Sequence, residues 1–114
     1  MDPFTHAFRG IKTFFRTTRN ASVHLCVALA ALASGCYFRI SNFEWIALCL
    51  TIGIVFIAEA FNTAIEIDMN LTSPQYHPYA RDTKDVAAGA VLMSAILSII
   101  VGLFIFLPKI LSLF

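Results

Sequence analysis

The sequence predicts an all-α integral membrane protein, with three transmembrane helices preceded by an amphipathic surface helix. Of its 114 residues, 59% are hydrophobic and only 13% are charged, whereas a soluble domain is normally about half apolar and about a quarter charged. Three long apolar runs, separated by short polar segments, predict the three spans. We expect one membrane-embedded domain over residues 1–114. The eight Lys and Arg residues are too few for a groove that binds nucleic acid.

Residues 4–19 have the pattern of a helix that lies in the headgroup plane of a membrane. Apolar side chains share one stripe at about 100° per residue: Phe4, Ala7, Phe8, Ile11, Phe14 and Phe15. Basic side chains gather on the flank and back of the helix: Arg9, Lys12, Arg16 and Arg19. These two faces are typical of an interfacial helix. The alternative is a soluble helix packed on a core, but the chain offers hardly any soluble remainder.

The membrane spans are expected over three segments, about residues 23–40, 43–70 and 84–107. The shortest covers about 18 residues, which is enough for a hydrocarbon core of roughly 30 Å. The first span is rich in Ala, Ser and Gly, small residues that let helices approach closely. Residues 71–83 are expected to form a polar connection, with Asp82 or Thr83 capping the third span and Pro108 marking its end.

The basic residues predict the orientation. Six of them lie on the N-terminal helix and the connection before the third span: Arg9, Lys12, Arg16, Arg19, Arg81 and Lys84. Arg39 and Lys109 lie on the other side of the membrane. Because cytoplasmic segments of membrane proteins are richer in Lys and Arg, we expect the N-terminus in the cytoplasm and the C-terminus outside.

The second span carries one concentrated polar stripe. At about 100° per residue, Glu59, Asn62 and Glu66 lie within roughly 60° of one another, and Asn70 extends the same stripe. Asp68 points to the opposite side of the helix. A carboxylate at the depth of Glu59 must face protein, an ion or water, because contact with lipid costs several kcal/mol.

The predicted orientation brings this stripe to the same membrane face as His77, Lys84 and Asp85. Such a set suits phosphoryl transfer, because carboxylates hold Mg²⁺, a cation neutralises phosphate oxygens, and a carboxylate such as Glu59 can take the proton of a lipid hydroxyl. Judged by spacing alone, two other interpretations are as well supported as catalysis. The polar residues could join helices to one another, or they could line a path for ions. The sequence has no glycine-rich phosphate loop, zinc-type Cys/His spacing or Ser/His/Asp arrangement.

Three segments carry a resemblance to a known family. They are residues 58–66 (Ala-Glu-Ala-Phe-Asn-Thr-Ala-Ile-Glu), 76–78 (Tyr-His-Pro) and 84–92 (Lys-Asp-Val-Ala-Ala-Gly-Ala-Val-Leu). The Glu-x-x-Asn-(Ser/Thr)-Ala-Ile-Glu block followed by Lys-Asp at this distance is quite specific. With weaker matches in residues 8–11 and 19–24, the chain resembles the small bacterial membrane lipid kinases, the prokaryotic diacylglycerol kinase and undecaprenol kinase family, over nearly its whole length.

The resemblance implies a homotrimer of three-span subunits in the bacterial cytoplasmic (inner) membrane. It implies ATP, with Mg²⁺, as the phosphate donor for a lipid alcohol, either undecaprenol or diacylglycerol. By position, Glu59 would be the catalytic base, Glu66 a metal ligand, and Asn62 and Asn70 supporting residues. Contacts to the nucleotide are implied for a further group: Gln75, Tyr76, His77, Lys84 and Asp85. Residues 87–92 look more like the undecaprenol kinase branch than the enterobacterial diacylglycerol kinase type.

The sequence departs from the family pattern at the metal site. Thr18 stands where the family usually has a second acidic ligand, and Asn70 where an Asp is often found. Ser22 replaces an Arg that is common in undecaprenol kinases. The alternative function is that of a non-catalytic membrane protein, a channel or a regulatory subunit on the same scaffold. We also expect three short spans to shield Glu59 too little, so that neighbouring subunits close the site.

Overall fold

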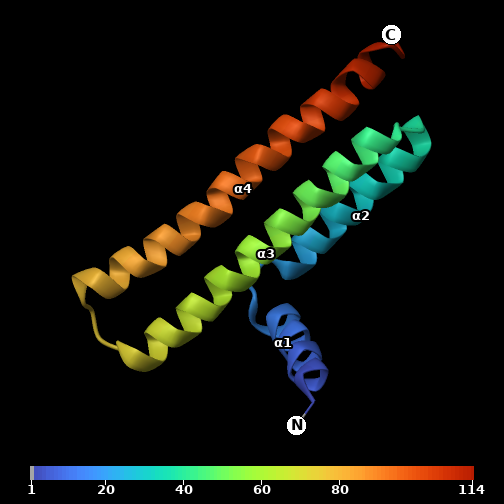
Figure 1. Cartoon of the computed structure of the whole chain (residues 1–114). Coiled ribbons are helices and arrows are strands. Elements are labelled where there is room, and N and C mark those ends of the chain that lie inside the picture. Colours follow the sequence, from blue (N-terminus) through green and yellow to red (C-terminus); the bar gives the residue numbers. More distant parts are fainter. Residues whose placement is uncertain (1) are drawn as a thin grey trace.

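The computed structural model describes residues 2–114, and this part of the chain is helical apart from short turns (Figure 1). Its helices follow in the order α1 (Pro3–Thr17), α2 (Ala21–Phe38), α3 (Asn42–Thr72) and α4 (Pro78–Leu111). Each of the last three is long and apolar enough to cross a membrane. The predicted class, a short first helix followed by three spans, is confirmed.

Local signals in the sequence explain where the first three helices begin and end. Asp2 caps α1, because its side chain accepts a hydrogen bond from the Phe4 amide at 2.9 Å. α2 ends at Phe38, and its capping residue Arg39 adopts the left-handed backbone conformation with φ of 52°. α3 starts with a capping box, in which the side chains of Ser41 and Glu44 each bind the other residue's backbone amide.

The start of α4 differs from the prediction. The helix begins at Pro78, and the His77 ring caps it by accepting a hydrogen bond from the Tyr79 amide at 3.1 Å. Asp82 and Thr83 therefore lie inside the helix and do not cap it. Proline suits the first helical position, because the amide it lacks would have no partner there.

The other end of α4 also differs. Pro108 lies within the helix, which continues to Leu111. Because α4 begins at Pro78, the connection between α3 and α4 is short and covers residues 73–77 instead of the expected 71–83. At the opposite end of this hairpin, Lys109 of α4 and Glu44 of α3 form an ion pair with 2.7 Å between Nζ and Oε2. The hairpin is thus joined by a turn at one end and by an ion pair at the other.

α3 is the central helix and packs along α4 for much of its length (Figure 1). Ile40, Leu48 and Ile105 form a buried cluster near the turn between α2 and α3. The Trp45 ring lies against Gly35 of α2, and a Cβ atom at Gly35 would come within 2.7 Å of that ring. The expectation that small residues of the first span permit a close helix approach is confirmed at Gly35.

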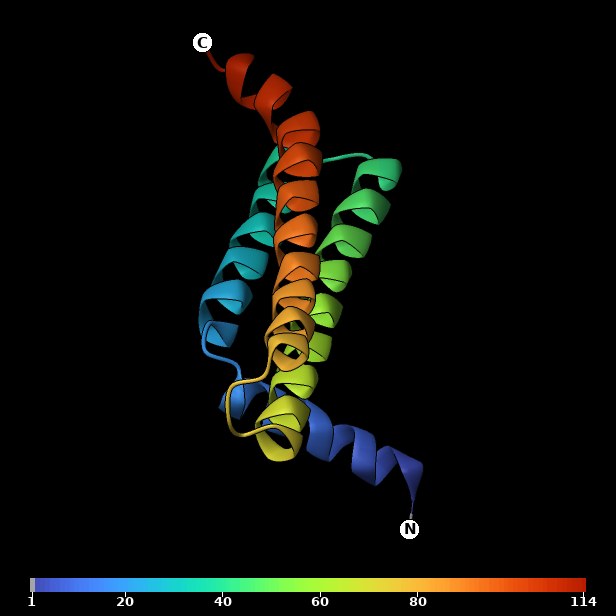
Figure 2. The same ribbon diagram turned by 90° about the vertical axis from the view of Figure 1, so that its left-hand side faces the viewer.

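α1 runs crosswise to the three long helices, close to the start of α2 (Figures 1 and 2). α3 and α4 continue beyond the first residues of α2, so their connecting turn projects from the bundle (Figure 1). Phe4 and Phe8 of α1 are strongly exposed, as expected of side chains that face a bilayer. Phe14 and Phe15, at the end of α1, instead pack on Phe56 of α3.

Candidate functional site

Glu59 is buried within a single chain, at the junction of α1, α2 and α3. Only 8% of the residue is exposed. The Nε2 atom of His24, the fourth residue of α2, lies 2.7 Å from Glu59 Oε1. The expectation that one subunit would leave Glu59 poorly shielded is therefore wrong, because the start of α2 folds against this turn of α3.

Thr18 lies in the same junction, on the link between α1 and α2. Its hydroxyl oxygen is 2.7 Å from that of Thr63, one turn beyond Glu59 on α3. Thr63 is itself buried. The hydroxyl pair therefore brings Thr18, the position at which the resemblance implies an acidic metal ligand, close to the turn of α3 that holds Glu59.

Asn62 contributes a polar atom without a partner. Its Oδ1 is buried and, among the described residues, receives no hydrogen bond. Leaving a buried acceptor unpaired costs about 1–3 kcal/mol. The same stretch of α3 thus presents a shielded carboxylate at Glu59 and a carboxamide oxygen that is free to accept a hydrogen bond.

An aromatic cluster joins the surface helix to this part of α3. Phe56 lies with its ring centroid 6.3 Å from those of both Phe14 and Phe15. The His24 ring meets the other side of the cluster, with its centroid 6.5 Å from that of Phe56 in an edge-to-face arrangement. Because Phe56 precedes Glu59 by nearly one helical turn, the cluster fixes α1 and His24 beside the buried carboxylate.

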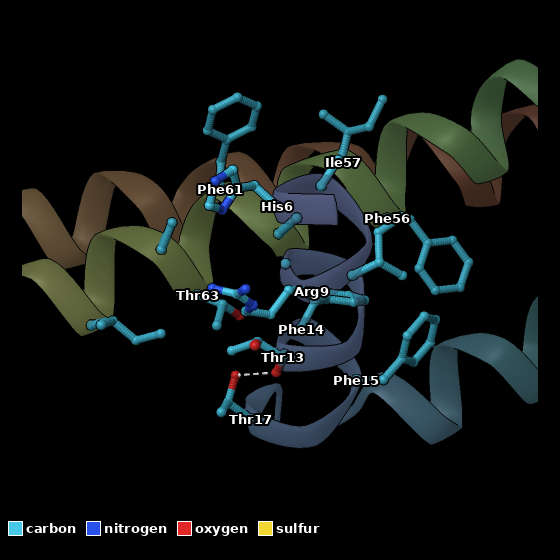
Figure 3. A pocket seen from close by; sticks show the side chains of 16 residues that line it. His6, Arg9, Thr13, Phe14, Phe15, Thr17, Phe56, Ile57, Phe61 and Thr63 are labelled. Carbon is cyan, nitrogen blue, oxygen red and sulfur yellow. Dashed lines mark hydrogen bonds between the residues drawn. The ribbon is translucent and has the colours of Figure 1, made fainter. Parts of the chain in front are cut away.

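A groove of about 1030 Å³ runs between α1 and α3 (Figure 3). Its wall is largely apolar and includes Phe14, Phe15, Phe56, Ile57 and Phe61. Thr63, the partner of Thr18, also lines the groove. A second groove, of about 630 Å³, lies among α2, α3 and α4 and reaches His24. Apolar space thus approaches the Glu59 junction from two sides.

The turn between α3 and α4 carries a second polar group, farther along the hairpin. Lys84 Nζ donates a hydrogen bond to Asn70 Oδ1 at 2.6 Å, which joins the end of α3 to α4. The Arg81 guanidinium donates to the Tyr76 hydroxyl at 3.1 Å. Gln75, like Tyr76, is exposed. This end of the hairpin is open to solvent.

Glu66 lies between these two groups and is exposed, as is Asp85 on α4. Within residues 2–114, no three His, Cys, Asp or Glu side chains gather closely enough to hold a metal ion by themselves. Mg²⁺ in phosphoryl-transfer enzymes usually needs only one or two carboxylates, because the substrate phosphates and water supply the other ligands. The side chains present therefore fit a magnesium ion that arrives with a nucleotide, and do not fit an all-protein metal cage.

The predicted site residues thus fall into two places. Glu59 and Asn62 lie at the junction, whereas the nucleotide candidates lie around the α3–α4 turn. His24 and Phe56 were not predicted to be neighbours of Glu59. The signal for His24 was present, since it is the single histidine in the apolar run of α2. Nothing in that run indicates which residue of α3 it meets.

Three spanning helices with a carboxylate buried at one end of the bundle define a small polytopic membrane protein with a polar site. The prokaryotic diacylglycerol kinase family matches residues 5–106. The chain belongs to this family, and it is an enzyme of the lipid kinase class. The resemblance seen in the sequence is therefore confirmed.

Two characterised relatives show how far the similarity extends. The undecaprenol kinase of Bacillus subtilis (strain 168) is 46% identical over 106 residues, which cover 93% of this chain and 86% of that protein. The diacylglycerol kinase of Synechocystis sp. (strain ATCC 27184 / PCC 6803 / Kazusa) is 39% identical over 111 residues. That match covers 96% of this chain and 63% of the relative, so the Synechocystis protein is considerably longer.

Proposed function

We propose that this protein transfers the terminal phosphoryl group of ATP to the hydroxyl of a membrane lipid at the cytoplasmic face. The observation that carries the proposal is the setting of Glu59, a buried carboxylate on the stretch of α3 whose residues Phe56, Ala60 and Thr63 line an apolar groove. A lipid chain fits the groove between α1 and α3, because its wall is largely apolar. The lipid hydroxyl would then reach the junction where Glu59 and Asn62 lie.

Each polar side chain has a distinct part in this proposal. The lipid hydroxyl oxygen attacks the terminal phosphorus, the bond from phosphorus to the bridging oxygen breaks, and ADP leaves with the electron pair. Glu59 accepts the proton that the hydroxyl loses. The unpaired Oδ1 of Asn62 can accept a hydrogen bond from the same hydroxyl before the transfer. Lys84 supplies positive charge for the phosphates.

Mg²⁺ is proposed as the metal that accompanies ATP, and it would neutralise charge on the phosphate oxygens when bound. Glu66 is the carboxylate of this chain that would hold it, because it is exposed and lies about two turns along α3 from Glu59. Gln75, Tyr76, His77 and Asp85 are proposed to contact the nucleotide. The support is their position around the exposed turn and the start of α4, near Lys84.

Undecaprenol is the preferred lipid in this proposal, and diacylglycerol is the second candidate. The support is the higher identity to the Bacillus subtilis undecaprenol kinase, 46% against 39% for the Synechocystis diacylglycerol kinase. The undecaprenol kinase match also covers most of both proteins.

We further propose a homotrimer, in which a neighbouring subunit completes the exposed half of the site. Glu59 is shielded by its own chain, but Glu66, Gln75 and Asp85 are exposed on a single chain. A second subunit could cover these residues and enclose the nucleotide. Native mass measurement in detergent should give three chains per particle, and a fully active monomer would contradict the proposal.

The decisive experiment uses purified protein in lipid, ATP with Mg²⁺, and a panel of undecaprenol, diacylglycerol and monoacylglycerol. Phosphate transfer to at least one lipid is expected, and Glu59→Gln should lower it by about 100-fold or more, because it removes the general base. Glu44→Gln, the same change at the far end of α3, should retain turnover. No transfer to any lipid, together with no ATP binding, would favour the non-catalytic alternative, a channel or a regulatory subunit.

A further inference from the structure

The contact between His24 and Glu59 requires a proton between the two side chains. Nε2 of His24 and Oε1 of Glu59 are 2.7 Å apart. Two lone pairs at this separation would repel each other, whereas an N–H group facing a carboxylate oxygen forms a short, charge-assisted contact. Both side chains are mostly shielded, with 26% of the His24 side chain and 10% of the Glu59 side chain exposed. Such a contact is stronger in this setting than it would be in water.

We infer that His24 is the positioning residue of Glu59. It donates its Nε2–H to Oε1, which fixes the plane of the carboxyl group and leaves Oε2 to face the lipid hydroxyl. This inference rests on the proposed function, in which Glu59 is the base. During transfer the lipid proton passes to Oε2 of Glu59, and His24 keeps its own proton throughout. His24 therefore touches neither the lipid nor the nucleotide.

The surroundings of His24 suit this role. Phe56 holds the ring from one side in an edge-to-face contact with 6.5 Å between centroids. Phe56 and Glu59 lie nearly one turn apart on α3, so the same stretch of helix orients the imidazole and accepts its hydrogen bond. Phe14 and Phe15 brace Phe56 from α1. Aromatic packing therefore holds the ring while its Nε2 meets the carboxylate.

Among residues 2–114, no Lys or Arg side chain pairs with Glu59. The Lys and Arg ion pairs of the described chain join Arg81 to Asp82 and Lys109 to Glu44, at the two ends of the α3–α4 hairpin. A carboxyl group that relied on solvent for its orientation would sample several rotamers. In the catalytic sites of other enzymes, a base is commonly oriented by a third group in this way.

The test compares three replacements of His24 in the lipid kinase assay. His24→Gln keeps an amide N–H near the place of Nε2, His24→Asn carries its amide too close to the backbone, and His24→Leu carries no donor. We expect kcat to fall about 10- to 100-fold in the Leu and Asn variants, since a small misplacement of a catalytic group costs this much. The Gln variant should recover most of the lost rate. KM for the lipid and for ATP should stay unchanged in all three.

Ser34→Ala is the matched control, because it removes a polar side chain from the same helix. The Ser34 hydroxyl bonds only to the carbonyl of Ala30 in its own helix, at 2.8 Å. This variant should keep the wild-type kcat. If kcat fell as much in Ser34→Ala as in His24→Leu, the loss of any polar side chain from α2 would impair the enzyme. That result would overturn the specific role of His24.

A spectroscopic measurement tests the pair without using activity. In protein labelled with ¹⁵N-histidine, the Nε2 resonance of His24, identified by its absence in His24→Gln, should be that of a protonated nitrogen. It should shift in Glu59→Gln and remain in place in Ser34→Ala. An unprotonated Nε2, or a resonance that does not respond to Glu59→Gln, would overturn the inference even if the Asn and Leu variants of His24 fail to fold.

The outcomes separate this inference from the proposed function. If the wild type phosphorylates no lipid, the proposed function fails and the positioning role falls with it, whatever the spectrum shows. If the wild type is active and Glu59→Gln is not, while His24→Leu retains the wild-type kcat, the inference alone is wrong. A raised lipid KM in His24→Leu with unchanged kcat would also overturn it, since that pattern marks a residue that binds the lipid.

Discussion

Glu59 and Glu66 lie about two turns apart on one helix, yet their surroundings are opposite. Glu59 is 8% exposed and meets His24, whereas Glu66 is open to solvent. A base that takes a proton from a lipid hydroxyl benefits from a site that excludes water. A carboxylate that binds a magnesium nucleotide must remain accessible from water. The burial of each residue therefore agrees with the part proposed for it.

Thr18 provides a prediction at this scale. Thr18→Glu would add a carboxylate at the family's usual second acidic position, next to Thr63 at the junction. We expect the Mg²⁺ concentration for half-maximal activity to fall roughly tenfold, because a second negative ligand strengthens magnesium binding. The measurement is a Mg²⁺ titration of turnover, together with Mn²⁺ binding followed by electron paramagnetic resonance.

Thr17→Glu is the matched control for this prediction. Thr17 is the neighbouring residue, but its hydroxyl bonds to the Thr13 carbonyl at 2.7 Å and its side chain is exposed. Thr17→Glu should leave the Mg²⁺ concentration for half-maximal activity unchanged. An equal response in both variants would point to a general effect of negative charge, and no response in Thr18→Glu would show that Thr18 does not face the metal.

The α3–α4 hairpin sets the position of Lys84. Nζ lies 2.6 Å from Asn70 Oδ1, so the end of α3 holds the ammonium group on the first turns of α4. His77 and Pro78 start α4 immediately after the turn, which places Lys84 on a regular helix and not in a loop. A phosphate-binding cation on a rigid element can be held more precisely than one on a flexible segment.

Lys84→Met tests the nucleotide role. We expect KM for ATP to rise about 10- to 100-fold, because a charged hydrogen bond to phosphate contributes about 1.5–3 kcal/mol, while KM for the lipid stays the same. Lys109→Met is the matched control, since Lys109 lies at the far end of α4 and binds Glu44. It should leave both KM values unchanged. Steady-state kinetics with either substrate varied would decide, and an unaltered ATP KM in Lys84→Met would refute the assignment.

The close approach of α2 and α3 makes a prediction about stability. A Cβ atom at Gly35 would lie 2.7 Å from the Trp45 ring, whereas at Gly53 of α3 nothing lies within 4 Å. Gly35→Ala should lower the free energy of unfolding by about 1–3 kcal/mol through overpacking. Gly53→Ala should raise it by about 0.5–1 kcal/mol through better helix propensity. Unfolding experiments in mixed micelles would measure both changes in the free energy of unfolding. Equal changes in the two variants would contradict the prediction.

Features that depend on residues close together in the sequence could be predicted, whereas contacts between separate helices could not. Hydropathy and spacing within one helix predict the three spans and the polar stripe of α3, because these signals are local. The cap at His77 was missed because a histidine is an uncommon cap and the polar residues after it resembled a loop. The His24–Glu59 contact joins two helices, and no pattern within either one indicates the register between them.

The whole molecule has an asymmetric distribution of charge along its long axis. α1 and the start of α4, which carry most of the basic residues, lie toward the end with the α3–α4 turn, and the ends of α2 and α4 lie toward the opposite end (Figure 1). Arg39 caps the end of α2, and Lys109 lies in the last turn of α4. This distribution supports the proposed orientation, with α1 and the α3–α4 turn on the cytoplasmic side. The amphipathic α1, crosswise to the spans, is then placed at the level of the headgroups.

Cysteine labelling tests this orientation. The native cysteines Cys26, Cys36 and Cys49 are free and exposed, so they are first replaced by Ala. A membrane-impermeant maleimide added to intact cells should then label Ser112→Cys, near the end of α4, and leave Thr72→Cys, near the α3–α4 turn, unlabelled. Both should react after lysis. Labelling of Thr72→Cys alone in intact cells would reverse the proposed topology.

The unequal lengths of the helices have one more consequence. The 18 residues of α2 reach about 27 Å, whereas the 31 residues of α3 reach about 46 Å. The hairpin therefore rises roughly 19 Å past α2. The proposed nucleotide would bind at this projecting end, where it stays hydrated outside the hydrocarbon core. The lipid substrate would need only to bring its hydroxyl group to the membrane interface, while its hydrocarbon chain stays in the bilayer. The added phosphate charges the product, and because a charge is costly in the hydrocarbon core, the product should remain in the leaflet where it forms.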